Sequence, residues 1–144
     1  MNLSKQVKIS TAITPTAGAA AQTAITGTTL DMSGFEGVLC IVRMGAITGN
    51  AVTSIKMMQG ASTSPATDLE GTSQTVADDD DDETFYIDVY KPTKRYVAVK
   101  VLRATQDAVV ASAEYVQYGA KELPTSHATG VSGETHISPA EGTA

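Results

Sequence analysis

The sequence predicts an all-β protein, an antiparallel β-sandwich of jelly-roll type. Apolar side chains recur at every second position in several short stretches, which is the repeat of a pleated strand. Turn-forming residues separate these stretches at fairly regular spacing, and no stretch has the repeat of an amphipathic helix. About eight short strands in this arrangement are typical of a sandwich or barrel. An immunoglobulin-like sandwich is the alternative, because the sequence does not distinguish the two connectivities.

The clearest strands lie between Thr84 and Tyr118. Apolar side chains alternate over 84–90 and again over 97–102. Between them, Pro92 restricts the residue before it and disfavours a helix. A third apolar run, 108–118, follows a polar break. These runs predict three consecutive strands joined by short polar turns.

The N-terminal half predicts further strands that are shorter or less regular. We expect them at 5–13, 30–32, 38–44, 52–59 and 74–76. Both faces of 38–44 are apolar apart from Arg43, which favours a central, covered strand. The stretch 16–29 is almost wholly Thr, Ala and Gly, so we expect an extended arm or loop there. We expect 60–71 to be a loop.

The 144 residues predict one domain with loose ends. We divide it into an N-terminal strand and arm (1–29), a β-sandwich body (30–118) and a polar C-terminal tail or arm (119–144). The tail is rich in Ser, Thr and Gly and has too few apolar residues to bury itself. The core must be mainly aliphatic, because aromatic residues make up 5% of the chain and Trp is absent. So thin a core favours oligomerisation.

The charge and hydropathy patterns argue against two classes of partner. A net charge of -6 with ten Lys and Arg residues disfavours a nucleic-acid coat protein, which needs concentrated cations for phosphate. The N-terminus lacks the apolar segment of a secretory signal, and no stretch approaches the ~20 apolar residues of a membrane span. We therefore expect a soluble chain made in the cytoplasm that binds neither nucleic acid nor membrane.

The sequence predicts no enzyme, metal or cofactor site. Cys40 lies in an apolar run and is expected to be a small buried side chain. The acidic run 78–83 lacks the spacing of an EF-hand and is more typical of a solvated turn than of a cation site. His127 and His136 match no zinc spacing, and we expect both to be exposed. Neither a nucleophile elbow nor a phosphate-binding loop is present in the sequence.

The candidate interface residues surround one basic turn. Lys91, Lys94 and Arg95 stand out in an acidic chain. They indicate either an exposed turn or a contact with an acidic partner, which includes the acidic run of a neighbouring copy. We add Tyr90 and Tyr96, which flank them. The chain's tyrosines offer a surface for stacking on sugars, but half-buried rings with the hydroxyl at the rim are more typical; the tyrosines are Tyr86, Tyr90, Tyr96, Tyr115 and Tyr118.

A segment of the chain resembles a family of phage proteins. The residues DVYKPTKRY (88–96) follow an acidic turn, and the sequences RAT (103–105) and YVQYG (115–119) come after them. This pattern, within 72–121, is similar to that of the capsid decoration or cement proteins of tailed bacteriophages. The resemblance implies a β-sandwich or jelly-roll module, commonly a homotrimer, that binds the major capsid protein on the outside of the head, often through terminal arms. It implies no catalytic residues.

The resemblance leads us to expect a non-enzymatic virion protein that stabilises the capsid by bridging neighbouring capsomers. Such a protein would be located on the outer surface of the capsid. The alternative is a phage fibre or another surface recognition module that binds host glycan.

Overall fold

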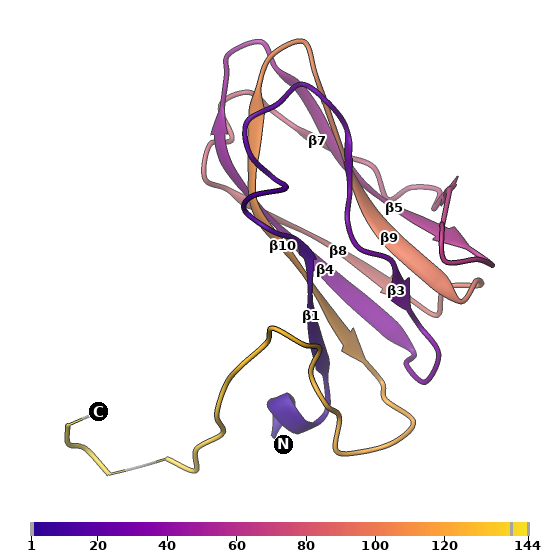
Figure 1. The fold of residues 1–144 in the computed structure, drawn as a ribbon, viewed down its shortest axis with the longest axis vertical. Coiled ribbons are helices and arrows are strands. Elements are labelled where there is room, and N and C mark those ends of the chain that lie inside the picture. Colours follow the sequence, from indigo (N-terminus) through magenta and orange to yellow (C-terminus); the bar gives the residue numbers. More distant parts are fainter. Residues whose placement is uncertain (1, 139, 144) are drawn as a thin grey trace.

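The computed structural model describes residues 2–138 and 140–143, and it is a sandwich of two antiparallel sheets (Figure 1). In sheet A the strands are, in order, β1 (Lys8–Ile13), β10 (Ala108–Tyr118), β4 (Gly37–Ile47) and β8 (Thr84–Tyr90). In sheet B, β9 (Tyr96–Ala104) pairs with β5 (Val52–Gly60). The short strands β2 (Ile25–Thr26) and β3 (Leu30–Asp31) flank β9, and β6 (Thr67–Asp68) and β7 (Gln74–Val76) flank β5.

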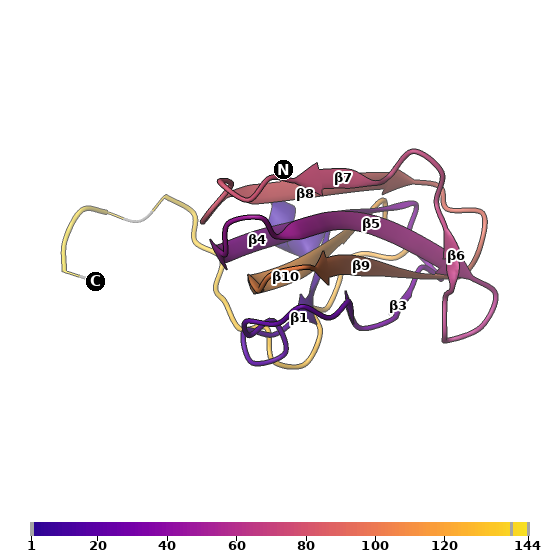
Figure 2. The same cartoon turned by 90° about the horizontal axis from the view of Figure 1, so that it is seen from above.

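The connectivity is that of a jelly roll. If β2 and β3 are counted as one interrupted strand, and β6 and β7 as another, the ten strands become eight. These eight pair first with last, second with seventh, third with sixth and fourth with fifth. Every connection except that from the fourth to the fifth passes from one sheet to the other, as seen from above in Figure 2. This topology confirms the predicted jelly roll over the immunoglobulin-like alternative.

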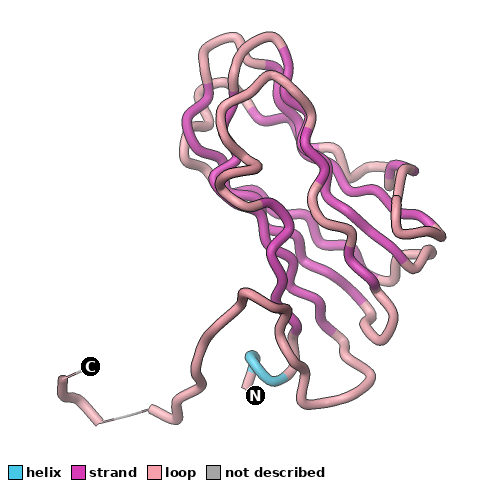
Figure 3. Tube along the Cα trace, viewed as in Figure 1, coloured by secondary structure: helices cyan, strands magenta, loops and turns pink. Residues whose placement is uncertain are grey.

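Most of the predicted strands are present, with shifted ends (Figure 3). The first strand begins at Lys8 rather than Lys5, because Leu3–Lys5 forms a 3-10 turn closed by bonds from the Gln6 and Val7 N–H groups to the Leu3 carbonyl. Two strands of two residues each lie where we expected no strand, β2 within 16–29 and β6 within 60–71. The strand expected at 38–44 is confirmed as a central one, because β4 lies between β10 and β8. The expectation that both of its faces are covered is wrong, because Leu39 and Ile41 on the outer face are only half-buried.

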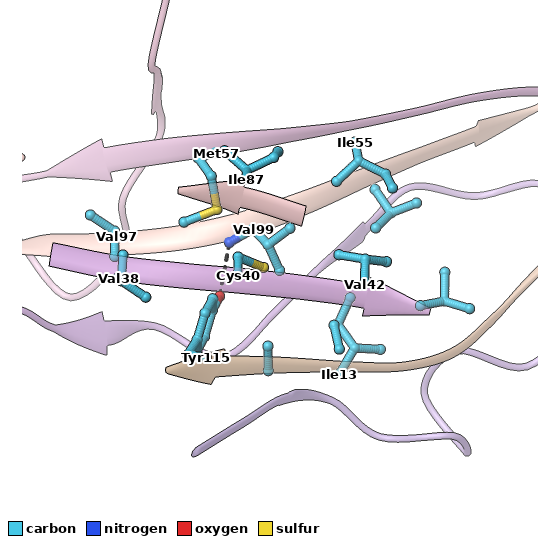
Figure 4. Close-up of a cluster of buried hydrophobic side chains, with 14 of the residues drawn as sticks. Ile13, Val38, Cys40, Val42, Ile55, Met57, Ile87, Val97, Val99 and Tyr115 are labelled. Carbon is cyan, nitrogen blue, oxygen red and sulfur yellow. Dashed lines mark hydrogen bonds between the residues drawn. The ribbon is translucent and has the colours of Figure 1, made fainter. Parts of the chain in front are cut away.

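The core between the sheets is aliphatic (Figure 4). Alternate residues of β4 point into it and are fully or almost fully buried, namely Val38, Cys40, Val42 and Met44. Cys40 is therefore the small buried side chain that we predicted. Burial disfavours the thiolate, with a smaller effect from Glu114, and together they raise the pKa of Cys40 to about 12.

Tyr115 connects the two sheets through the core. Its side chain leaves β10, and its hydroxyl accepts a hydrogen bond from the Val99 N–H of β9 at 2.8 Å (Figure 4). The same hydroxyl donates to the Thr28 carbonyl at 3.0 Å, in the gap between β2 and β3. Gly27 makes room for it, since a Cβ there would lie 3.0 Å from the hydroxyl oxygen and 2.7 Å from Val99 Cγ1. The hydroxyl thus accepts the Val99 N–H on the side where β2 and β3 leave a gap, while Met57 of β5 pairs with Val99 on the other side.

Arg103 holds the Ala/Thr/Gly-rich segment 16–29 against the body. Its guanidinium donates to the carbonyl oxygens of Gly18, Ala19, Thr23 and Ala108 at 2.8 to 3.4 Å. Burial lowers the pKa of Arg103, and these carbonyls provide the hydrogen bonds that water would otherwise supply. The segment therefore lies on the sandwich, where Ala21 also bridges to Ala108.

We predict that Tyr115→Phe lowers the free energy of unfolding by about 1–3 kcal/mol, because the Val99 N–H and Thr28 carbonyl lose a buried partner. The matched control is Tyr86→Phe, whose ring is 65% exposed and which should change stability little. Urea unfolding of the three proteins measures the difference. Equal stability of Tyr115→Phe and the control would show that the bridging hydroxyl has no energetic role.

Candidate interaction surfaces

Chain segments that are distant in the sequence meet at one end of the sandwich. The loop 91–95 lies beside the turn 33–36 and the residues after β10, and backbone bonds join them, from Lys91 to Glu36 and from Lys121 to Gly34. A hollow of about 440 Å³ at this end is lined by the cations Lys91, Lys94, Arg95 and Lys121. We call these four residues the basic end. Lys121 is missing from the sequence prediction because it is close to the others only in the fold.

Two of the four cations at the basic end contact neighbouring side chains, and only one of these contacts is an ion pair. Arg95 donates to both oxygens of Asp31 at 3.0 and 2.8 Å, and this contact holds the pKa of Asp31 below its usual value. Lys91 lies over the Tyr90 ring, with its Nζ 5.0 Å from the ring centroid. Among the residues that the structure describes, Lys91, Lys94 and Lys121 form no ion pair. Their charges are therefore available to an acidic partner.

The predicted interface residues share one end of the molecule but not one face. Tyr90 is exposed and ends β8 on the outer side of sheet A, whereas Tyr96 begins β9 in sheet B and is half-buried. Arg95 lies over the Tyr96 ring at 5.2 Å. The loop 91–95 therefore connects two surfaces that point in opposite directions.

The outer side of sheet A is apolar and aromatic. Pairing aligns Val116 with Leu39 on adjacent strands, and Ile41 with Tyr86. We call this surface the aromatic face; its members are Leu39, Ile41, Tyr86, Tyr90, Val116 and Tyr118. All six are half-buried or exposed. Carboxylates share this side of the sheet, since Asp88 lies opposite Leu39 and Glu114 opposite Ile41. Exposed apolar and aromatic side chains gathered in this way are typical of protein contacts.

The ring of Tyr118 orders one end of the aromatic face. It lies over Gly37, where a Cβ would come within 2.3 Å of the ring, and is parallel to the Tyr90 ring at a centroid distance of 6.5 Å. Its hydroxyl donates to Asp88 Oδ1 at 2.6 Å. The expectation of half-buried tyrosines is wrong for Tyr86 and Tyr90, which are 65% and 58% exposed, and for Tyr115, which is fully buried.

The acidic run occupies the opposite end of the sandwich. Three of its carboxylates accept backbone N–H groups and so build the turn: Asp78 from Asn50, Asp80 from Ala77 and Asp81 from Ile47. Within the described part of the chain, no group of three or more His, Cys, Asp or Glu side chains is placed to hold a metal ion. The run is thus partly structural, which explains its close attachment to the β4–β5 loop.

The two histidines differ in their surroundings. His127 is half-buried, and its Nδ1 accepts the Ile9 N–H of β1 at 3.1 Å. His136 is exposed and lies 3.0 Å from a Glu134 oxygen. The expectation of two exposed histidines is therefore confirmed for His136 and wrong for His127, because the tail folds back onto the edge of sheet A.

Comparison with known proteins assigns no family. No family model matches the chain, and no curated protein matches it. One similar solved chain belongs to Bacillus endospore appendages, described as a family of disulfide-linked pili. The match covers 78% of this chain and 81% of that one, at 17% identity and a TM-score of 0.43, and it supports no functional assignment. In the part of the chain that the structure describes, no helix is long and apolar enough to cross a membrane.

We predict that the Tyr118 hydroxyl ionises at a higher pH than an ordinary tyrosine, because desolvation and the bond to Asp88 raise its pKa to about 12. Since the folded-state pKa exceeds the unfolded value of about 10, the stabilisation is complete below pH ~10 and is lost as the pH rises toward 12. Alkaline titration followed by tyrosinate absorbance checks this. Tyr118→Phe should remove an ionisation step near pH 12 that Tyr86→Phe retains. Loss of a step near pH 10 instead would contradict the assignment.

Proposed function

We propose that this chain is a non-enzymatic structural protein of a phage virion that binds the outer surface of the head and bridges neighbouring capsomers. The observation that carries the proposal is the meeting of two exposed surfaces at Tyr90 and Lys91. There the aromatic face adjoins the basic end, and an apolar patch beside free cations suits a protein partner with an acidic rim. The major capsid protein is the proposed partner.

The fold suits a load-bearing role of this kind. Jelly rolls of two packed sheets recur in viral capsid domains. A protein that binds only the assembled shell shifts the equilibrium toward that shell. Contacts that are weak individually suffice, because a lattice presents many of them at once. A homotrimer at positions of three-fold symmetry is the arrangement that we propose.

Attachment to the shell would be non-covalent. Cys40 is the single cysteine of the chain, and its relative exposure is 0% in the core. Its raised pKa further disfavours the thiolate that disulfide exchange requires. Copies of the folded protein therefore have no accessible thiol through which to link.

A glycan-binding module is the second candidate. The exposed rings of Tyr86 and Tyr90 on the aromatic face favour it, since sugars stack on exposed aromatic rings. This alternative predicts that the isolated protein binds a glycan array and that it does not bind purified heads. Head binding without glycan binding would decide for the structural role.

We predict that neutralising the three free cations weakens head binding at least about tenfold, which corresponds to about 1.4 kcal/mol. The variant is Lys91→Ser, Lys94→Ser and Lys121→Ser combined, measured by co-sedimentation with purified heads that lack the protein. A control variant replaces Lys5 and Lys100, two lysines outside the basic end that form no ion pair among the described residues. The wild-type protein should also lose affinity as salt increases. Undiminished binding of the test variant would overturn the role of the basic end.

A further inference from the structure

The β1 edge of sheet A is partly covered by the chain's own C-terminal tail. Strand β1 has β10 on one side only. On its other side, the Ala128 N–H donates to the Ile9 carbonyl of β1, and just before the strand the Thr125 N–H donates to the Lys5 carbonyl, both at 3.0 Å. We call residues 125–128 the edge segment. An uncovered sheet edge is a template for pairing with another chain, so the segment occupies a site at which chains can bind.

Side chains of the edge segment form further hydrogen bonds with the backbone of residues 7–9. The Thr125 hydroxyl donates to the Val7 carbonyl. His127 Nδ1 accepts the Ile9 N–H, in the place where a neighbouring strand would offer a carbonyl. The site therefore recognises this sequence through a hydroxyl and an imidazole at fixed spacing. A generic extended peptide lacks that pair.

The attachment of the tail is shallow. No side chain in 121–138 is buried, and residues 121–124, which connect the edge segment to the body, are all exposed. Beyond the segment, the chain passes the N-terminal turn, where Thr135 contacts Ser4, and then leaves the sandwich (Figures 1 and 2). Ile137 in that part is 95% exposed. Detachment thus breaks a few hydrogen bonds at the surface and leaves the core intact, which places the tail among the elements that open most easily.

We propose that the β1 edge is a strand-docking site whose occupant in the assembled protein is the edge segment of a second copy. The contacts made in trans are the same as those made in cis, so the exchange has little net cost once copies are held close together. Thr125 and His127 both bond at this site, so a second copy of this chain offers groups that fit it and that an unrelated peptide lacks. The inference rests on the proposed function to the extent that an assembly brings the copies together.

The test uses a contact outside the edge segment. Ser4 Oγ and Thr135 Oγ1 lie 2.6 Å apart, so cysteines at these positions are close enough for a disulfide. In dilute solution, the double variant Ser4→Cys/Thr135→Cys should form an intrachain disulfide. Equal amounts of the single variants Ser4→Cys and Thr135→Cys, mixed and bound to heads or concentrated, should form an interchain disulfide that gel electrophoresis resolves as a dimer. Cys40 should not interfere, because it is buried.

The controls make each outcome decisive. Thr135→Cys mixed with Ser62→Cys, an exposed position outside the contact, should give no dimer above background. His127→Leu, which removes the acceptor for the Ile9 N–H, should lower the dimer yield and speed amide exchange at Ile9. Dimer from the test pair alone supports the exchange. Failure of the double variant to form its disulfide, or an intrachain disulfide without interchain dimer in the assembled sample, overturns it.

The outcome separates this inference from the proposed function. If the mixed Ser4→Cys and Thr135→Cys variants bind heads without forming the interchain disulfide, the structural role stands and the exchange is overturned. Protein that forms the dimer in concentrated solution but never binds heads would support the exchange and remove the role on the capsid.

Discussion

The hydroxyl of Tyr115 is the contact on which the architecture depends most. It joins β10 of one sheet to β9 of the other and to Thr28 in the segment between β2 and β3. Short strands and a low-complexity segment offer few apolar groups for burial, so a buried hydrogen bond at their junction determines where they lie. Gly27 is required beside it because any larger residue would occupy the space of the hydroxyl. Arg103 likewise fixes the N-terminal part of the segment 16–29, through a hydrogen bond to the Ala19 carbonyl.

Apolar side chains remain at the surface of the sandwich as well as in its core. The aliphatic residues fill the space between the sheets, and the outer side of sheet A still presents Leu39, Ile41 and Val116, each half-buried. A chain that leaves such a face uncovered gains burial when it associates. The charges are divided as well, with the acidic run at one end of the strands and the basic end at the other. The two ends of the molecule thus present charges of opposite sign.

Local patterns predicted the strands well, because alternation is a property of consecutive residues. The two-residue strands β2 and β6 were missed, since two residues carry no periodic signal. Features that depend on pairing were also missed: Lys121 at the basic end, the stacking of Tyr118 on Tyr90, and His127 on the β1 edge. Each joins residues far apart in the sequence, and their contacts follow from register and topology rather than from composition. The basic turn itself, Lys91 to Arg95, was visible in the sequence because its residues are adjacent.

The central claim is that this jelly roll acts by adhesion to a larger shell. Electron cryomicroscopy of the particle that carries the protein tests it most directly. The account predicts density for the sandwich on the outer surface of the head, with the basic end and the aromatic face against neighbouring subunits. Absence of the protein from the shell, or density in which both surfaces face solvent, would contradict the account.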